Sequence, residues 1–501
     1  MKAAPITNRQ QTTHRQVPKL VGSRELFVKN CAPGGSIVMF SLVFGSIGIV
    51  MIGALVSWAL GSSKLARAKL NSEIAFQIAE SGVDYYRWHL AHDTDDYQDG
   101  TGLPGPYVHE FRDKDGNLIG HYSLSITPPP VGSTIVTIVS TGYTVANPNH
   151  QRKVQVQLAI PSLARYAVAA NANMRFGSGT IIYGPVHSNG GIRFDGLAYN
   201  VVTSAKSKYD DPDHSGAQEF GVHTHIYPTD PLPPNAVPSR PDIFVAGRQF
   251  PVPAIDFAGI SGDLAEIKSD AQANGHYFAS SGALGYRLVL KTNDTFDLYR
   301  VNSLKSAPWG CSSSQSGWGT WSINTYGSSQ TLLGTYAFST NGLIFLEDHV
   351  WVEGQIQTAR LTIASARFPE NPSTNTSITI NNDLHYTTYD GQDVMALMAQ
   401  NNINIGLYSE DNLQLDAAVV AKNGRVGRYY YSSSCGSNYI RNTITLNGMI
   451  ATNQRYGFAY TDGTGYINRN INYDANLLYG PPPSFPLTSD QYALISWEEL
   501  R

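Results

Sequence analysis

The sequence has little charge and few cysteines for a chain of 501 residues. Only 15% of the residues are charged and only three are cysteine, whereas glycine, proline and tyrosine number 46, 27 and 29. This composition is more typical of a strand-and-turn exterior protein than of a helical cytosolic enzyme. A hydrophobic content of 42% still allows sizeable cores, which excludes disorder over most of the chain.

Motifs that would identify an enzyme are absent as well. The sequence contains no Cys-x-x-Cys, no G-x-S-x-G, no P-loop and no dinucleotide-binding glycine motif. After residue 35 the chain holds 29 basic and 38 acidic residues, a net charge of −9 that argues against nucleic-acid binding. We therefore expect a non-enzymatic protein with no cofactor and no nucleic-acid partner.

One long stretch lacks charge completely. No charged side chain occurs between Lys29 and Lys64, and residues 36–60 are mostly apolar, which gives about 37 Å of helix for a bilayer core of about 30 Å. A cleaved signal peptide has an apolar region of only about 7–15 residues and a small-residue exit, and neither is present. The basic leader 1–35 carries a net charge of +5, which predicts a single-pass helix with its N-terminus inside.

The helical pattern continues beyond residue 60. Residues 64–92 contain no proline, and one arc of this segment is apolar while the opposite arc is charged. The sequence predicts one helix over 36–92, with a transmembrane half at 36–60 and an amphipathic half that packs on a globular domain. The apolar arc holds Ile74, Ala75, Ile78, Ala79, Gly82, Tyr86 and Leu90.

Small residues recur at every fourth position in the apolar half. Gly53, Ser57 and Gly61 form such a ridge, where the backbone of another helix can approach closely. We expect this ridge to pack against neighbouring helices.

The first ninety residues combine three features. The leader ends in "PGG", an uncharged helix follows, and "AFQIAESGVDYYRWHL" occupies 75–90. Together they resemble the N-terminal region of PilX-like minor pilins of type IV pili. The resemblance implies that prepilin peptidase cleaves after Gly35, leaving Ser36 first, and that the helix then packs among other pilins. Phe40 stands where major pilins carry glutamate, so the resemblance is to a minor subunit.

Five later segments resemble the β-rich exterior domain of uncertain function that often follows such helices in bacterial sequences. They are "GTIIYGPVHSNGGIRFDG" (179–196), "NGLIFLEDHVWVEGQIQTARLTIAS" (341–365), "LDAAVVAKNGRVG" (415–427), "INYDANLLYGPPPSFP" (471–486) and "SWEEL" (496–500). The location implied is the bacterial cytoplasmic membrane, with the large domain outside, and then an extracellular pilus.

The rest of the chain has the periodicity of strands, so the expected fold class is α+β and mainly β. Alternating apolar residues predict a small antiparallel β head at 106–160, which covers the amphipathic half of the helix. Residues 165–501 show short apolar triplets broken by Gly, Asn or Ser, which favours a β-solenoid-like exterior domain, with a β-sandwich as the alternative.

Three irregular segments are expected within the exterior domain. A Pro-rich and helical insertion lies at about 205–278, with its helix at 255–274, and an exposed excursion lies at 302–340. The C-terminus is expected to pack back on the exterior domain through Phe485, Leu494, Ile495 and Trp497.

Two of the three cysteines lie in exterior loops rich in serine and glycine. Cys311 and Cys435 form a candidate disulfide, with two unrelated free thiols as the alternative, whereas Cys31 lies in the leader.

A polar cluster and a group of carboxylates are the candidates for chemistry. The cluster does not follow the EF-hand ligand order, and both rings of its "HTH" can face solvent, so we expect no metal site. Glu347, Asp348 and Glu353 lie near one predicted coil with no evident basic partner, and we interpret them as solvated turn residues. The cluster consists of His187, His214, His223 and His225 with Asp210, Asp211 and Asp213.

Aromatic side chains in loops are the candidates for surface contact, because exposed rings can stack on sugars or fill a partner's pocket. We expect a minor pilin-like protein of a type IV pilus or related filament, active in assembly, adhesion and contact with a surface, partner or glycan. The alternative is a permanently anchored envelope protein with a β-solenoid domain that binds carbohydrate or cleaves polysaccharide. The contact candidates are Trp309, Trp318, Trp321, Tyr429, Tyr430 and Tyr431.

Overall fold

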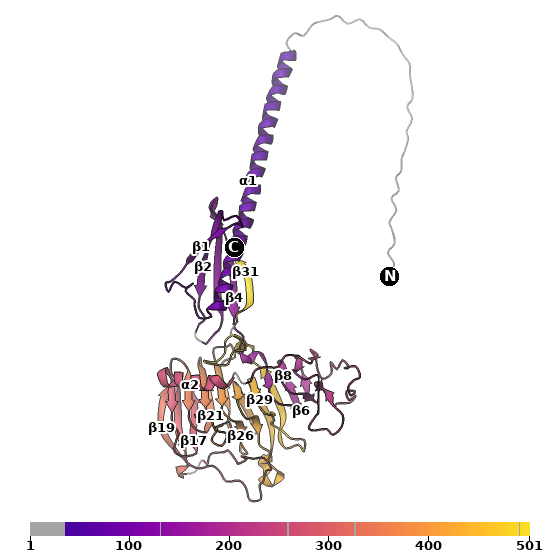
Figure 1. The fold of residues 1–501 in the computed structure, drawn as a ribbon, viewed down its shortest axis with the longest axis vertical. Helices are drawn as coiled ribbons and strands as arrows, with labels where there is room; N and C mark the ends of the chain where they lie inside the picture. The colour runs from indigo at the N-terminus through magenta and orange to yellow at the C-terminus, as the bar shows by residue number, and fades with distance from the viewer. Residues whose placement is uncertain (1–35, 131, 258–259, 325–326, 490, 501) are drawn as a thin grey trace, which may run out of the picture. The chain divides into compact units, whose positions relative to one another are not determined.

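The computed structural model describes residues 36–130, 132–257, 260–324, 327–489 and 491–500 (Figure 1). The chain divides into two compact units, residues 1–70 and 71–501, and helix α1 is continuous over Ser36–His92. The predicted long helix, small antiparallel sheet and large mainly-β domain are all present. The predicted leader, with Gly35 as its last residue, lies outside the described residues.

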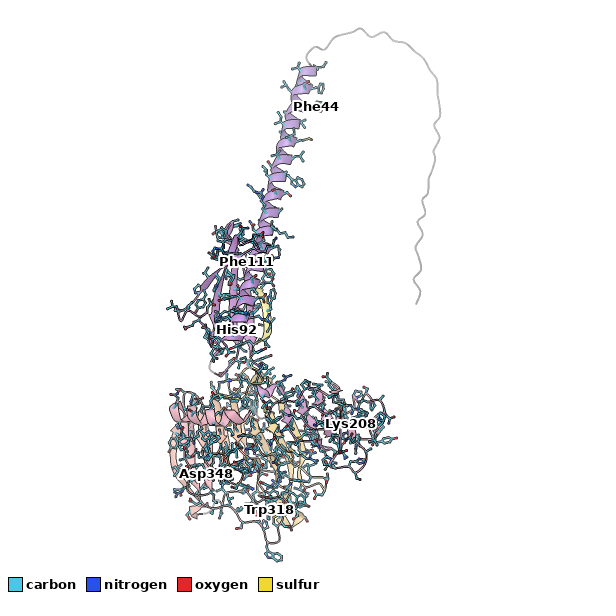
Figure 2. All side chains as sticks on the ribbon, viewed as in Figure 1. Phe44, His92, Phe111, Lys208, Trp318 and Asp348 are labelled. Atoms are coloured by element: carbon cyan, nitrogen blue, oxygen red, sulfur yellow. A yellow bond between two sulfur atoms is a disulfide. The ribbon has the colours of Figure 1, made fainter. Side chains whose placement is uncertain are left out.

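Over residues 37–60 of the first unit, α1 is apolar on every side. Leu42, Phe44 and Leu55 are largely exposed, and Figure 2 shows Phe44 projecting from the helix. Within the part of the chain that the structure describes, α1 is the helix whose length and composition would allow it to cross a membrane. A helix that is apolar all round needs lipid or other helices around it.

The predicted ridge of small residues lies on this exposed half. A Cβ atom added to Gly53 or Gly61 would meet nothing within 4 Å, and Ser57 is exposed. The ridge is therefore accessible, and its packing against another helix stays a prediction.

The second half of α1 packs on a five-stranded antiparallel sheet with the strand order β1-β2-β3-β4-β31. Ile78, Tyr86 and Leu90 of the predicted apolar arc are fully buried and form one core with Leu124 and Ile138 of the sheet. The strands are β1 (Tyr107–Arg112), β2 (Leu118–Thr127), β3 (Val136–Thr144), β4 (Asn147–Ala159) and β31 (Ala493–Leu500).

Helix α1 approaches strand β3 so closely that only glycine fits at one position. A Cβ atom on Gly142 would lie 2.2 Å from the carbonyl oxygen of Ala75 and 2.4 Å from the backbone nitrogen of Ala79. Both contacts are with backbone atoms, which cannot rotate away as a flexible side chain would. The missing side chain of Gly142 thus sets the distance between helix and sheet.

The C-terminal strand differs from the prediction, because β31 belongs to the head sheet and not to the exterior domain. It pairs antiparallel with β4, placing Leu494 opposite Leu158 and Trp497 opposite Val156. Leu494 and Trp497 remain about half exposed, whereas Phe485 does pack into the exterior domain. The strand's partner lies more than 300 residues earlier, so no local pattern in the sequence could identify it.

The exterior domain consists of short strands stacked in parallel ladders, whereas a β-sandwich is built from antiparallel sheets. One ladder contains β16 (His276–Phe278), β20 (Leu343–Leu346), β22 (Arg360–Ser365), β25 (Val394–Ala399), β27 (Asn412–Ala421), β29 (Ile440–Thr452), β5 (Val168–Ala170), β8 (Val186–Ser188), β11 (Val202–Ser204) and β15 (Arg248–Gln249). A second contains β17 (Gly285–Lys291), β21 (Val350–Ile356), β24 (Leu384–Tyr386), β27, β29, β30 (Gly465–Tyr473), β7 (Thr180–Ile182) and β10 (Leu197–Ala198). Shorter ladders join β21 to β23 (Ile378–Thr379), β26 (Ile403–Ile405) and β28 (Val426–Arg428), and β6 (Met174–Phe176) to β9 (Ile192–Phe194) and β14 (Val222–His223).

A column of aliphatic residues runs through the first ladder. Each member is paired in register with the next, and all are buried in one continuous core. Stacking branched side chains on their counterparts in the next strand buries apolar surface at every step, which is the main stabilising contribution in such ladders. The column consists of Ile344, Ile363, Leu397, Val419, Ile450, Val168, Val186 and Val202.

The order of strands in this ladder differs from their order in the chain. The chain enters at β5, continues through β8, β11 and β15, and then begins again at β16 and returns to β29, which pairs with β5. Figure 1 shows the result as yellow β29 close to magenta β8. The two ends of the exterior domain therefore meet: the Ser162 N–H donates to Leu478 O, and the Thr488 N–H donates to Pro161 O.

The irregular segments are more ordered than expected. Strands β14 and β15 of the predicted insertion join the parallel ladders, and Leu264, Ile267 and Ala271 of its helix are buried on the outer side of the domain. The expected excursion contains β19, which pairs antiparallel with β18. The remaining elements are β12 (Lys208–Tyr209), β13 (Glu219–Phe220), α2 (Ile260–Asn274), β18 (Thr295–Val301), β19 (Gln330–Ala337), and the short helices η1 (Leu163–Arg165), η2 (Gly327–Ser329), η3 (Ser433–Cys435), η4 (Ser437–Tyr439) and η5 (Ala475–Leu478).

The Gly142→Ala variant is expected to destabilise the head, because the added methyl group must push the backbone of α1 away from β3. Overpacking of this kind costs about 1–3 kcal/mol. Thermal unfolding of the full chain in detergent, with hydrogen exchange over residues 71–92, measures the change. The matched control is Gly177→Ala, where a Cβ atom meets nothing within 4 Å. Equal stability of the two variants would contradict the close approach.

Candidate contact site

A disulfide joins Cys311 and Cys435, which are 124 residues apart in sequence and have Cα atoms 4.3 Å apart. It ties the loop that precedes η2 to the segment of η3 and η4. Cys435 is fully buried beside Leu407 and Tyr431, so the disulfide is the centre of a small apolar cluster. A buried disulfide fits a domain that lies in an oxidising compartment outside the cytoplasm.

The six aromatic contact candidates have different environments. Trp309 is completely exposed and Tyr430 is partly exposed, whereas Tyr429 and Tyr431 are buried at 5% and 1% exposure. Trp318, labelled in Figure 2, and Trp321 pack partly against the disulfide cluster. The prediction of surface contact is therefore wrong for Tyr429 and Tyr431.

Hydrogen bonds explain why these rings turn inward. The hydroxyl of Tyr431 donates to Gly319 O at 2.7 Å, and the indole N–H of Trp321 donates to Gly317 O at 3.1 Å. Buried tyrosine and tryptophan need such partners for their polar atoms. The rings thus fix the conformation of the glycine-rich loop at 317–319.

A buried arginine that the sequence analysis did not single out organises the same region. Arg428 is fully buried and donates to Leu407 O at 3.1 Å, Ser409 Oγ at 2.9 Å and Asn438 O at 2.7 Å. Burial lowers the pKa of its guanidinium from 12.5 to about 10. The sequence "GRVGRYYY", in which Arg428 directly precedes three tyrosines, is the feature that could have identified this arginine.

A cleft of about 940 Å³ lies beside this region. Arg425 donates to Gln315 Oε1 at 3.2 Å and stacks over the Tyr429 ring at 5.0 Å, while Arg455 forms an ion pair with Asp213. The cleft residues include Arg175, Arg425, Arg455, Arg469, Asp213, Gln315, Asn402, Gln454, Tyr429, Tyr456, Tyr460 and Tyr466.

The lining gives the cleft a positive and aromatic character. The donors of Arg469 are taken by backbone carbonyls of Tyr466 and Ile467 and by the Thr180 hydroxyl, so this arginine is structural. Guanidinium groups that remain partly accessible can form paired hydrogen bonds with a carboxylate, and tyrosine rings can stack on a sugar. The arrangement can therefore hold an acidic or aromatic group of a partner.

The three carboxylates near the predicted coil have basic partners, contrary to the sequence interpretation. Glu347 pairs with Lys268, and Glu353 pairs with Arg287. Asp348 is buried, lies 2.6 Å from Arg367, and accepts hydrogen bonds from the backbone N–H and hydroxyl of Ser281. These partners come from elsewhere in the chain, so adjacent sequence could not reveal them.

The predicted histidine cluster forms only in part. The ring centroids of His223 and His225 are 5.0 Å apart, and those of His214 and His225 are 4.7 Å apart, whereas His187 lies elsewhere beside Thr203. The expectation that both rings of "HTH" face solvent is wrong for His223, which is fully buried.

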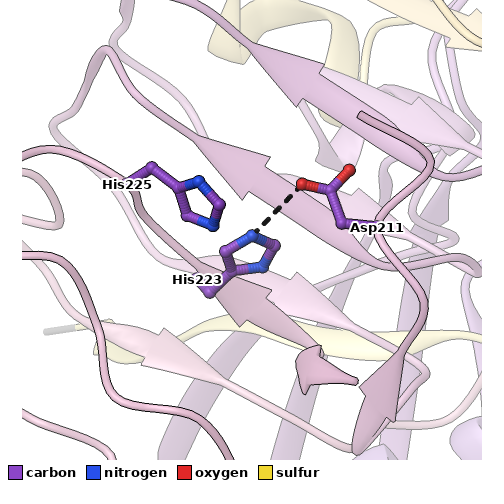
Figure 3. A group of neighbouring side chains, drawn as sticks. All are labelled: Asp211, His223 and His225. Atoms are coloured by element: carbon purple, nitrogen blue, oxygen red, sulfur yellow. Dashed lines mark ion pairs between the residues drawn. The ribbon is translucent and has the colours of Figure 1, made fainter. Parts of the chain in front are cut away.

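Carboxylates surround these three rings. Ligand-type atoms lie within 4.8 Å of one another in two groups that share His225: one adds Asp211 and His223 (Figure 3), the other His214 and Glu219. Asp213 forms an ion pair with Arg455 and belongs to neither group, and Asp210 is exposed. Histidine and carboxylate groups at this spacing are the ligand types that zinc and related ions prefer.

Comparisons with known proteins give little further information. No protein-family model and no curated protein matches the chain. Among solved structures, one similar chain is the competence-associated pilin ComZ from Thermus thermophilus, with 13% sequence identity and a TM-score of 0.31 over 86% of this chain and 98% of that one. At that TM-score the likeness supports no conclusion, so function must be inferred from the residues described above.

Removal of the disulfide is expected to loosen the loop around residues 308–321 and the segment of η3 and η4, while the parallel ladders stay protected. A crosslink that closes a loop of this length contributes about 2–5 kcal/mol. Hydrogen exchange of the Cys435→Ser variant measures the change. Cys311→Ser and the double variant should behave identically, because each breaks the same bond. Additive effects of the two substitutions would contradict a shared crosslink.

His349 lies beneath the disulfide-tied loop, with its ring 5.3 Å from that of Trp321. Its Nδ1 accepts a hydrogen bond from the Ser377 N–H at 3.0 Å, which requires Nδ1 to be unprotonated. Burial lowers the pKa of this imidazole below its ordinary value of 6.5. The folded protein therefore holds His349 in its neutral form.

The exterior domain is expected to lose stability as the pH falls below about 6.5, because the unfolded chain takes up a proton on His349 that the folded chain resists. In the His349→Asn variant, Oδ1 can accept the Ser377 hydrogen bond without titrating. Thermal unfolding between about pH 7.5 and pH 5 should therefore show a weaker pH dependence, by about 1 kcal/mol. The variant His385→Asn, at a partly exposed position, serves as control, and parallel pH profiles for wild type and His349→Asn would refute the role of His349.

Proposed function

We propose that the chain is a non-enzymatic, PilX-like minor pilin of a type IV pilus or a related filament. The observation that carries the proposal is helix α1, one continuous helix that is apolar and exposed in its first half and buried on the head sheet in its second. Such a helix can be held by lipid and later by other helices, because both surroundings are apolar. The leader that ends at Gly35 supports the same role.

In this proposal the exterior domain makes contact with a surface, a glycan or another protein. Trp309 is completely exposed, and the neighbouring cleft offers the accessible side chains of Arg455 and Tyr460. Exposed tryptophan and arginine are the residue types that contribute most to binding energy at interfaces. The disulfide holds the Trp309 loop to the domain, which lowers the entropy lost on binding.

The alternative is a permanently anchored envelope protein that binds carbohydrate or cleaves polysaccharide. The cleft is compatible with carbohydrate binding. Polysaccharide cleavage has less support, because the candidate carboxylates Glu347, Asp348 and Glu353 are each engaged in an ion pair with lysine or arginine. The two proposals differ most clearly in what happens to the leader.

In a strain with active prepilin peptidase, we expect the mature protein to begin at Ser36 and to occur in sheared pili. The Gly35→Val variant should keep its leader and be absent from sheared pili, because a bulky residue replaces the glycine after which cleavage is proposed. The adjacent Gly34→Ala is the matched control and should be processed normally. N-terminal sequencing of the membrane and pilus fractions distinguishes these outcomes.

Two results would contradict the proposal in different ways. Uncut wild-type protein confined to membranes would favour the permanently anchored alternative. Protein cut after Gly35 but absent from every filament preparation would retain the processing step and rule out incorporation into a pilus.

A further inference from the structure

The cluster around His225 has an arrangement that the proposed function does not use. It lies on three short strands of the segment between β11 and β15: Asp211 follows β12, Glu219 belongs to β13, and His223 ends β14. Figure 3 shows the rings of His223 and His225 next to each other, with Asp211 facing His223. The cluster thus comes from a single short segment, residues 211–225, whose strands bring these side chains to one point.

The hydrogen bonding of His223 directs a lone pair toward this point. Its Nδ1 lies 3.3 Å from Phe220 O, a carbonyl that can only accept, so Nδ1 carries the proton. Its Nε2 is then unprotonated, is fully buried and has no hydrogen-bond partner. An imidazole held through one nitrogen by a carbonyl, with the other nitrogen free, is the usual state of a metal-binding histidine.

The carboxylates also have buried oxygen atoms without partners. Asp211 Oδ2 and Glu219 Oε2 make no hydrogen bond, and Asp211 Oδ2 lies 3.5 Å from His223 Nε2, too far for a good hydrogen bond. Two electron-rich atoms therefore face each other in a buried site. A buried polar atom without a hydrogen-bond partner is destabilising, and a bound cation would remove that destabilisation.

The distances match a small cation with tetrahedral coordination. Bonds of about 2.0–2.1 Å in tetrahedral geometry place ligand atoms about 3.4 Å apart. Within the first group, His223 Nε2 and Asp211 Oδ2 are 3.5 Å apart, and a ring nitrogen of His225 lies within 4.8 Å of both. In the second group, His225 Nε2 makes a hydrogen bond of 3.3 Å with Glu219 Oε1, and His214 Nδ1 lies 3.5 Å from the same oxygen. Calcium prefers six to eight oxygen ligands and longer bonds, so the nitrogen-rich set favours zinc or a similar ion.

The charges around the cluster are compatible with a bound divalent cation. Arg193 Nη1 lies 3.5 Å from Asp211 Oδ2, but its Nε is held by Asp195 at 2.7 Å. Arg175 lies 3.9 Å from Asp195 and 3.7 Å from Asp213, so it too is engaged outside the cluster. Asp211 and Glu219 remain as two carboxylates without a full counter-charge.

A proton on His223 Nε2 is the competing explanation, since an imidazolium would pair with Asp211. A metal ion satisfies Asp211, His223 and His225 together, whereas a proton satisfies a single pair.

We propose that Asp211, His223 and His225 bind one divalent transition-metal ion of the zinc class, with Glu219 and His214 beside it. The site stabilises the segment between β11 and β15 by joining the chain that follows β12 to β14 and the chain that follows it. This proposal does not depend on the chain being a pilin.

The test uses the full chain in detergent, stripped of metal with a chelator and titrated with Zn²⁺ against a chromophoric competitor. We expect one tightly bound Zn²⁺ per chain and a rise in the unfolding temperature of the exterior domain. Co²⁺ in place of Zn²⁺ should give the strong visible absorption of a tetrahedral site. Absence of saturable binding by the wild-type chain would overturn the proposal.

Variants identify the ligands. His225→Gln, at a partly exposed position, and Asp211→Asn, which preserves size, should each weaken Zn²⁺ binding at least tenfold and remove the Co²⁺ absorption. The matched control is His385→Gln, because His385 also lies beside a carboxylate, 3.1 Å from Asp383, but is partly exposed and outside the cluster. Unchanged binding in both cluster variants, or an equal loss in His385→Gln, would show that Zn²⁺ binds elsewhere and would refute the site.

Discussion

The parallel pairing of β29 with β5 is the contact on which the rest of the arrangement depends. It places Ile450 on Val168 and so joins the last coil of the exterior domain to the first. Because of this pairing, residues 161 and 488 lie side by side, bridged by backbone hydrogen bonds. Only then can the chain leave the head through β4 and return as the adjacent strand β31. A ladder that ran in simple chain order would place the two ends at opposite edges.

The exterior domain is therefore an insertion between two neighbouring strands of the head. Two hydrogen-bonded connections hold it, and Arg360 adds a third by donating to Gly132 O of the head and to Gly480 O and Pro481 O of the returning chain. The head keeps its own core of α1 and the antiparallel sheet. The core of the head and the main core of the inserted domain share no buried residue, so each is a separate hydrophobic core.

The features that the sequence predicted correctly are those set by neighbouring residues, namely the long helix and the first four strands of the head. Within the described residues, helix α1 runs without a break to the predicted end at His92 because its apolar arc from Ile74 to Leu90 repeats with the helical period, and the first four head strands follow simple alternation. What depends on distant partners was missed. Strand β31 forms by pairing with β4, which lies more than 300 residues earlier. The Tyr431 ring is buried because its hydroxyl donates a hydrogen bond to Gly319 O. The carboxylates of the predicted coil pair with residues far away in the sequence, such as Lys268. His223 and Asp211 were both in the candidate cluster, but the complete burial of the His223 ring beside Asp211 was not predicted.

Two buried polar residues, Arg469 and His223, show how hydrogen bonding distinguishes a structural side chain from a candidate ligand. Arg469 and His223 are both nearly inaccessible and both lie in the exterior domain. The guanidinium group of Arg469 donates its hydrogen bonds to the Thr180 hydroxyl and to backbone carbonyls, so its N–H groups are not available to a ligand. His223 donates a hydrogen bond from Nδ1 to Phe220 O, whereas its Nε2 faces Asp211 Oδ2 and neither atom has a hydrogen-bond partner. Since burying an unpaired polar atom is costly, only the second arrangement calls for an additional component, and the adjoining carboxylates specify that it be positively charged.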